Sequence, residues 1–337
     1  MTFETRKAAY ERLATERNST VISFITGHRT DLPAQINPDA IPVLVEHLDL
    51  IGVTRKISLF LNSTGGSITA AWTIANLLRQ FCDELEVIVP YKAHSAATLI
   101  CMAADIIVMT KQATLGPVDP SITHLLNPVA TNAIGARQFV PISVEAVNGY
   151  VEFLRNSLVS FRSDGPTAAG AAGDPKLQEP SSGGDLSDAL AKLADHVHPI
   201  VLGEVYRQRG HIRMLAKRLL MRTLKDDAQL EKVLAFLCGD SGNHEYTIFR
   251  REAETELKLK IQKPGEAGYR LVKAIYDDFA TEMLLDRELK VGPNTNTTVP
   301  VALIESLQGG EHRVDIKIVS DQHGNVRTEP TGWLKHG

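Results

Sequence analysis

The sequence lacks the features that mark several common classes of protein. Its formal net charge is −4 at pH 7, with 36 Lys and Arg against 40 Asp and Glu, so no excess of one sign favours binding to nucleic acid or to a membrane surface. No apolar run approaches the ~20 residues of a membrane-spanning helix. The first 20 residues are charged and helical in pattern, unlike a signal peptide. We therefore expect a cytoplasmic protein that binds no nucleic acid and has no membrane span.

Cysteines and cofactor motifs are also scarce. The three cysteines lie far apart without metal-ligand spacing, which predicts reduced core residues and no metal site. There is no G-x-G-x-x-G dinucleotide fingerprint, and the adjacent glycines Gly65 and Gly66 lack the Lys and Ser/Thr that complete a phosphate-binding loop. We expect the protein to need no cofactor.

Four apolar runs have the length and composition of buried strands, and segments with helical spacing separate the first three. The runs are Val21–Ile25, Ile57–Leu61, Leu85–Val89 and Ile106–Met109. This alternation predicts an α/β fold with a parallel sheet. Ligands in such folds bind outside the carboxyl ends of the strands. The Gly65–Gly66 turn and Ser95 both come shortly after a predicted strand, so the sequence predicts that they lie at this edge.

The stretch Pro90–Asp105 indicates a short approach to Ser95 followed by a helix of small and apolar residues. Serine is a common N-cap, and Ser95 could serve only in that way. A serine at a strand-to-helix turn can also act as a nucleophile, because its hydroxyl is exposed beside free backbone N–H groups. The amides of Gly66 and Ala96 could then bind the developing oxyanion.

Several motifs, in this order, resemble a known family. They are Asn62–Thr69 (NSTGGSIT), Lys92–Thr98 (KAHSAAT), Ala103–Met109 (AADIIVM), Leu115–Pro120 (LGPVDP) and His244–Ile248 (HEYTI). Together they resemble the Clp-fold serine proteinases often labelled serine dehydrogenase proteinases, related to the Clp protease proteolytic subunit and signal peptide peptidase A. The resemblance covers about Ser19 to Ile261. It implies a crotonase-like spiral of βαβ units, Ser95 as the nucleophile, and Gly65–Gly66 with the Ala96 N–H as the oxyanion hole.

The general base is the open question, because a serine hydroxyl is a poor nucleophile until a neighbour takes its proton. The histidine of the Clp protease aligns near Asp119, where this chain has none. His244 could serve instead, oriented by Glu245 or Asp119, since the pKa of a histidine suits the task. Asp119 could equally just shape a turn. Lys92 is the alternative base if it is desolvated, whereas we expect the adjacent His94 to have a packing role.

Composition and spacing also suggest how the chain is divided. A segment rich in Gly, Pro, Ala and Ser predicts a flexible linker or loop, and alternating apolar residues near the C-terminus predict a small β-appendage. The expected divisions are an N-terminal helix (1–18), a Clp/crotonase-like core (19–162), the flexible segment (163–187), a helical extension with the end of the core (188–290) and the β-appendage (291–337).

We interpret the chain as a serine hydrolase, and specifically as a peptidase that forms an acyl-enzyme on Ser95. The implied partners are a peptide or unfolded protein substrate, further copies of the chain in a homo-oligomer, and a separate ATPase or adaptor. One alternative is a scaffold or binding protein that kept the fold and lost the base. Another is a crotonase-type acyl-CoA enzyme, in which the same two amides would hold a thioester enolate.

Overall fold

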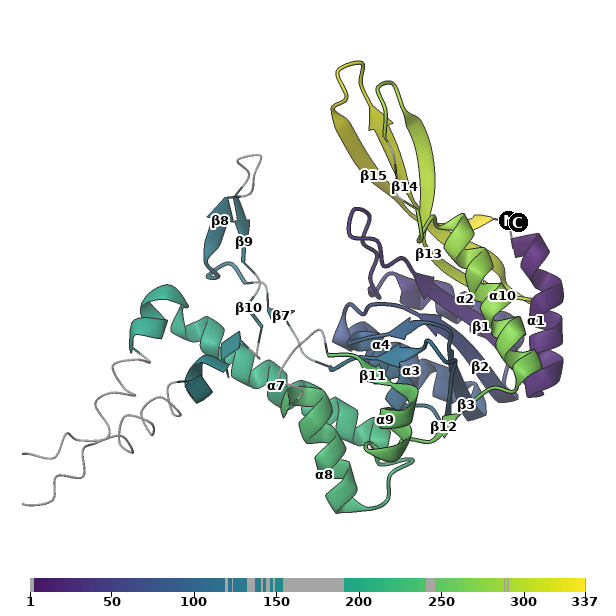
Figure 1. Cartoon of the computed structure of the whole chain (residues 1–337), viewed down its shortest axis with the longest axis horizontal. Helices are drawn as coiled ribbons and strands as arrows, with labels where there is room; N and C mark the ends of the chain where they lie inside the picture. The colour runs from purple at the N-terminus through teal and green to yellow at the C-terminus, as the bar shows by residue number, and fades with distance from the viewer. Residues whose placement is uncertain are drawn as a thin grey trace, which may run out of the picture. The chain divides into compact units, whose positions relative to one another are not determined.

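The computed structural model describes residues 3–118, 121–122, 124–131, 137–140, 142–143, 146–147, 149–153, 191–240, 246–287, 289 and 291–336 (Figure 1). The chain divides into two compact units. The first contains residues 1–118, 213–241 and 245–337, and the second contains residues 119–212 and 242–244. The predicted Gly65–Gly66 turn and Ser95 both belong to the first unit.

An eight-stranded mixed sheet forms the centre of the first unit, with strand order β12-β5-β3-β2-β1-β13-β14-β15. Five neighbouring strands run parallel: β1 (Thr20–Thr26), β2 (Thr54–Asn62), β3 (Cys82–Val89), β5 (Ile106–Met109) and β12 (Ile261–Gln262). The interiors of β1, β2, β3 and β5 are buried, as expected for parallel strands covered on both faces, whereas the two-residue edge strand β12 is partly exposed. The predicted α/β fold is confirmed, and each predicted strand lies within one of these strands.

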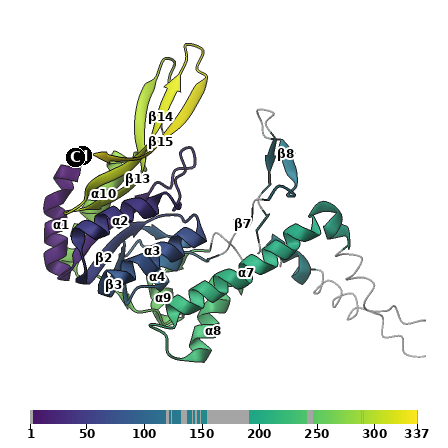
Figure 2. The same ribbon diagram turned by 180° about the vertical axis from the view of Figure 1, so that it is seen from behind.

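Helices cover both faces of this sheet (Figures 1 and 2). On one face α1 (Phe3–Arg17) and α10 (Glu266–Glu282) pack together over a continuous core. That core includes Ile25 from β1 and Phe60 from β2. Phe24, the residue next to Ile25, points to the opposite face of the sheet and is buried there. The connections along the chain are α2 (Ala40–Ile51), α3 (Ile68–Gln80) and α4 (Ala96–Met102). Each of the first two links parallel neighbours of the sheet, as in βαβ units.

The C-terminal strands continue the main sheet. They are β13 (Asn296–Ser306), β14 (Gly310–Ser320) and β15 (Val326–His336). β13 pairs antiparallel with β1, with Ile22 opposite Ser306 and Thr26 opposite Ala302. The sequence predicted a small β-appendage on the main fold with two alternating runs, and the structure describes three strands there, the first of which pairs with β1. The run 301–306 is buried throughout, which is the pattern of an interior strand.

Part of the predicted helical extension lies in the described residues. It contains α7 (Pro199–Leu220), α8 (Asp227–Ala235), a π-helical turn (Phe236–Asp240) and α9 (Arg250–Thr255). The Asp226 side chain caps α8 by accepting from the Gln229 N–H, which explains why a new helix begins there. None of the described helices is both long and apolar enough to cross a membrane.

The described part of the second unit contains two pairs of short strands beside its helical residues. β7 (Ser121–Ile122) pairs antiparallel with β10 (Ile142–Ser143), and β8 (Val129–Thr131) pairs antiparallel with β9 (Arg137–Phe139). Ile142 packs against Val201 and Val205 in a small core of this unit. The predicted flexible segment 163–187 lies outside the described residues.

A buried arginine fastens the N-terminal helix α1 to the rest of the first unit. Arg6 has a side chain only 1% exposed, and its guanidinium hydrogen-bonds to three carboxylates and lies 3.9 Å from a fourth, that of Glu311. Both Glu305 oxygens on β13 accept from it, and Asp278 and Glu282 on α10 accept at 3.2 and 2.6 Å. The Tyr10 hydroxyl also donates to Glu305, at 2.6 Å. Desolvating so many charges is costly, so the network is stable only while it is complete.

We predict that Arg6→Met lowers the free energy of unfolding by about 3–5 kcal/mol, because three carboxylates would lose their buried cation. The matched control is Lys7→Met, which removes an exposed pair with Glu4 on the same helix and should cost at most about 1 kcal/mol. Urea unfolding of both variants measures the difference. Equal losses of unfolding free energy in the two variants would show that the buried network stabilises the protein no more than the exposed pair does.

Candidate active site

Ser95 occupies a strained strand-to-helix turn. It lies between β4 (Lys92–Ala93) and α4, at the N-cap position, with φ 51° and ψ −116°. Few residues other than glycine adopt such a conformation, and holding one there costs of order 1–3 kcal/mol. The Ser95 side chain makes no capping hydrogen bond, so the geometry argues against a role as a helix cap alone. A partly exposed hydroxyl on a strained turn is the arrangement of a serine nucleophile.

Hydrogen bonds on both sides of the turn fix this conformation. Before it, the Ser63 N–H donates to the Lys92 carbonyl at 2.9 Å, and the His94 N–H donates to the Ser63 carbonyl at 3.0 Å. After it, the Thr98 hydroxyl bridges the Ala93 and Gly116 carbonyls at 2.7 and 2.8 Å. These bonds come from the end of β2 and from the start of α4, so the fold itself holds Ser95 in place.

The Gly65–Gly66 turn lies directly against Ser95. A Cβ atom on Gly65 would lie 2.8 Å from the Ser95 Cβ and 3.3 Å from the Ala96 nitrogen, and one on Gly66 would lie 2.4 Å from the Ile36 carbonyl oxygen. Both glycines also have positive φ, at 119° and 142°. Only glycine meets these two demands. The structure therefore brings together Ser95, Ala96 and the glycine turn.

Two backbone amides are available beside the hydroxyl. The Ile36 N–H donates to the Gly65 carbonyl, and the Ile36 carbonyl accepts from the Ser67 N–H, both at 2.8 Å. Among the described residues, the Gly66 N–H has no acceptor. Ala96 begins α4, and a first-turn N–H has no partner within its helix. Two free N–H donors next to an attacking oxygen can stabilise the anion of a tetrahedral intermediate.

Three of the predicted catalytic residues, His244, Glu245 and Asp119, lie outside the described residues. Lys92 is described, and its ammonium lies 4.9 Å from the centre of the Tyr91 ring. His94 has its Nε2 2.9 Å from the Thr114 hydroxyl. Its ring also lies so close to Gly116 that a Cβ there would approach it to 3.0 Å, which agrees with a packing role.

Sequence reasoning missed His28 at the same edge. His28 comes two residues after β1 ends, and its ring lies 5.6 Å from that of Tyr91. Burial lowers the pKa of His28, and the positive charge of Lys92 lowers it further, so the imidazole is neutral near pH 7. Its place shortly after the first predicted strand was the signal that could have identified it.

The described residues contain no group of three or more His, Cys, Asp or Glu side chains able to hold a metal ion. All three cysteines, Cys82, Cys101 and Cys238, are buried and free of disulfides. Burial raises the pKa of the Cys82 and Cys101 thiols, which disfavours the reactive thiolate at these two positions.

Comparison with known proteins agrees with the sequence resemblance. Residues 1–143 match the family model described as a ClpP-like SDH-type serine proteinase. The chain is 33% identical over 167 residues to the uncharacterized protein MJ0137 of Methanocaldococcus jannaschii, covering 43% of this chain and 57% of that protein. It is 42% identical over 66 residues to MJ1495 of the same organism, covering 20% and 23%. The chain thus spans less than two thirds of either relative.

Two kinds of solved structure resemble this chain with low TM-scores. The 1510-N membrane-bound stomatin-specific protease has a TM-score of 0.24 at 16% identity, covering 36% of this chain and 57% of that one. Methylmalonyl CoA decarboxylase in complex with 2S-carboxypropyl CoA has a TM-score of 0.25 at 14% identity, covering 65% and 91%. At these scores neither similarity bears on the function of this chain.

The strain at Ser95 predicts an unusual order of stabilities. Glycine adopts this φ and ψ without a clash, so Ser95→Gly should be about 1 kcal/mol more stable than Ser95→Ala. At ordinary helical positions glycine is instead the less stable by roughly 0.5–1 kcal/mol. Ala97→Gly in α4 provides that control, and urea unfolding measures all three variants. A Ser95→Gly protein less stable than Ser95→Ala would mean that the turn is not strained.

Proposed function

We propose that this chain is a serine peptidase that forms an acyl-enzyme on Ser95. The match of residues 1–143 to ClpP-like SDH-type serine proteinases supports a protein of this class. The observation that carries the proposal is the strained Ser95, whose hydroxyl is not used as a cap and lies beside the Gly65–Gly66 turn. Backbone strain of this kind persists where function requires it.

In the proposed reaction the Ser95 Oγ attacks the carbonyl carbon of a peptide bond while a base accepts the hydroxyl proton. The carbonyl oxygen becomes an oxyanion and accepts hydrogen bonds from the Gly66 and Ala96 amides. Collapse breaks the C–N bond, and the protonated base gives its proton to the departing amine. Water, activated by the same base, then hydrolyses the ester and regenerates the Ser95 hydroxyl.

His244 is our proposed base, with Glu245 or Asp119 as its orienting carboxylate. The assignment follows from the family resemblance of His244–Ile248 and from the suitable pKa of a histidine. Lys92 is the alternative, but it must lose its proton before it can act, and its ammonium lies against the Tyr91 ring, where a cation is favoured.

A peptide or unfolded protein would be the substrate, supplied by a separate ATPase or adaptor in the cytoplasm. We also propose that the chain forms a homo-oligomer. The α7 helix supports this, because it buries one apolar face and exposes further large apolar side chains, among them Tyr206 at 81% exposure. The others on this helix are Ile200 and Met214. Exposed apolar groups gathered along one element favour a protein partner.

The alternatives make less use of the site. A crotonase-type acyl-CoA enzyme would use the same two amides to hold a thioester enolate, but it would not need the strained Ser95. A scaffold would need neither the strain nor the free amides of Gly66 and Ala96. Both alternatives predict a Ser95 hydroxyl with ordinary reactivity.

A fluorophosphonate probe tests the proposal. We expect the wild-type protein to be labelled at Ser95, located by mass spectrometry, and Ser95→Ala to show no labelling. His244→Ala should slow labelling by about 100-fold or more, the usual contribution of a general base. Lys92→Met is the matched control and should label at close to the wild-type rate.

Other outcomes would reassign the roles. Fast labelling of His244→Ala with slow labelling of Lys92→Met would make Lys92 the base. A folded wild-type protein without any labelling of Ser95 would exclude the acyl-enzyme mechanism and favour a scaffold or an acyl-CoA enzyme.

A further inference from the structure

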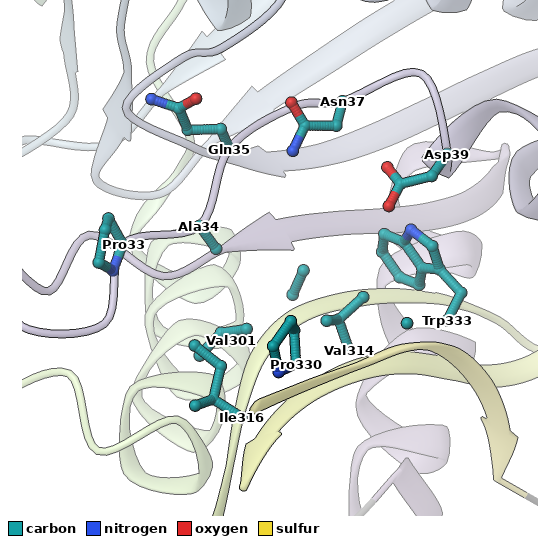
Figure 3. Close-up of a pocket in the computed structure, with 12 residues that line it drawn as sticks. Pro33, Ala34, Gln35, Asn37, Asp39, Val301, Val314, Ile316, Pro330 and Trp333 are labelled. Atoms are coloured by element: carbon teal, nitrogen blue, oxygen red, sulfur yellow. The ribbon is translucent and has the colours of Figure 1, made fainter. Parts of the chain in front are cut away.

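A cleft of about 500 Å³ lies in the first unit, between the segment 33–39 and the C-terminal strands. Figure 3 shows polar side chains along one side of it and apolar ones along the other. Gln35, Asn37 and Asp39 form the polar side. Neither the predicted catalytic residues nor the proposed mechanism uses this cleft, so its chemistry needs a separate explanation.

The part of the polar wall around Ile36 is extended and is joined to the Gly65–Gly66 turn. Alternate residues of an extended chain point to opposite sides. Gln35 and Asn37 therefore face the cleft, while Ile36 between them is fully buried. The backbone of Ile36 forms a parallel bridge with Gly66. Because neighbouring strands lie about 4.8 Å apart, the cleft wall is one strand spacing from the turn that touches Ser95.

The opposite wall is apolar and ends in a tryptophan. Val301, Val314 and Ile316 come from β13 and β14, and Trp333 comes from β15. The Trp333 ring lies 6.4 Å from the ring of Phe24 in the core. Its indole N–H is buried and has no acceptor among the described residues. An unpartnered donor of this kind favours a ligand that supplies an acceptor.

Charge decides which ligand the cleft favours. Asp39 is the only charged residue among those that line it, and none of the ion pairs between the described residues includes it. Asp39 also precedes α2 without capping it through its side chain. A free carboxylate, an aromatic ring and an apolar wall together suit a cation carried on an apolar stem. The side chains of arginine and lysine have this chemistry, and the backbone carbonyls around them supply acceptors for the indole N–H.

We propose that this cleft is an exosite that binds an arginine or lysine side chain of the peptide substrate, a few residues from the bond that is cut. The inference rests on the proposed peptidase function for the identity of the ligand. The parallel bridge between Ile36 and Gly66 connects the exosite to the glycine turn, so a peptide held in the cleft would be positioned near Ser95.

Tryptophan fluorescence tests binding without catalysis. The chain has two tryptophans, so Ser95→Ala combined with Trp72→Phe leaves Trp333 as the sole reporter in a protein that cannot turn over substrate. The ligands are an unstructured ten-residue peptide with one central arginine and the same peptide with citrulline, the neutral isostere. We expect a saturable change in Trp333 emission and at least fivefold tighter binding of the arginine peptide.

Asp39→Asn, made in the same background, should remove this preference. Asp49→Asn is the matched control, because it removes the same charge from an exposed position on α2 outside the cleft, and it should keep the preference. With Ser95 intact, Asp39→Asn should raise KM for arginine peptides about fivefold and leave kcat unchanged.

Two results would overturn the exosite: peptide binding that leaves Trp333 emission unchanged, or an arginine preference that survives Asp39→Asn. Fluorophosphonate labelling separates this failure from failure of the peptidase proposal. Labelling at Ser95 without charge-selective binding rejects only the exosite. Charge-selective binding without labelling rejects the peptidase and leaves the cleft as a site for cationic peptides.

Discussion

The close approach of the Gly65 backbone to Ser95 is the contact on which the rest of the site depends. A single added methyl group at Gly65 would lie 2.8 Å from the Ser95 Cβ, a distance that real atoms do not tolerate. Parallel pairing of β2 with β3 sets this separation, and the bridge between Ser63 and Ala93 carries the pairing past the strand ends. The main sheet thus positions two backbone amides around one hydroxyl.

Such a site stores energy that the surrounding structure must supply. The backbone of Ser95 costs of order 1–3 kcal/mol, and the Ala96 N–H at the start of α4 has no partner within its helix. The fold offsets this cost locally, because all seven residues of α4 are buried and Thr98 ties the helix to two carbonyls. Farther away, Arg6 and its carboxylates fasten α1 and α10 over the opposite face of the sheet.

Local sequence patterns predicted the parts of the structure that depend on neighbouring residues. The buried strands and the places of Gly65 and Ser95 at strand ends followed from apolar runs and turn residues. The pairing of β13 with β1 did not, because residues such as Ile22 and Ser306, 284 positions apart (306 − 22), form it, and no local pattern encodes a partner strand. The φ of Ser95 and the position of His28 beside Tyr91 likewise arise only from tertiary contacts.

A crystal structure of the protein after reaction with a phosphonate or boronic acid inhibitor tests the central claim most directly. The adduct should be bonded to the Ser95 Oγ, with one of its oxygens within about 3 Å of both the Gly66 and Ala96 nitrogens, the usual length of such a hydrogen bond. An adduct whose oxygens point away from these two amides, or one bonded to another residue, would contradict the assignment of the glycine turn and Ala96 as the oxyanion hole.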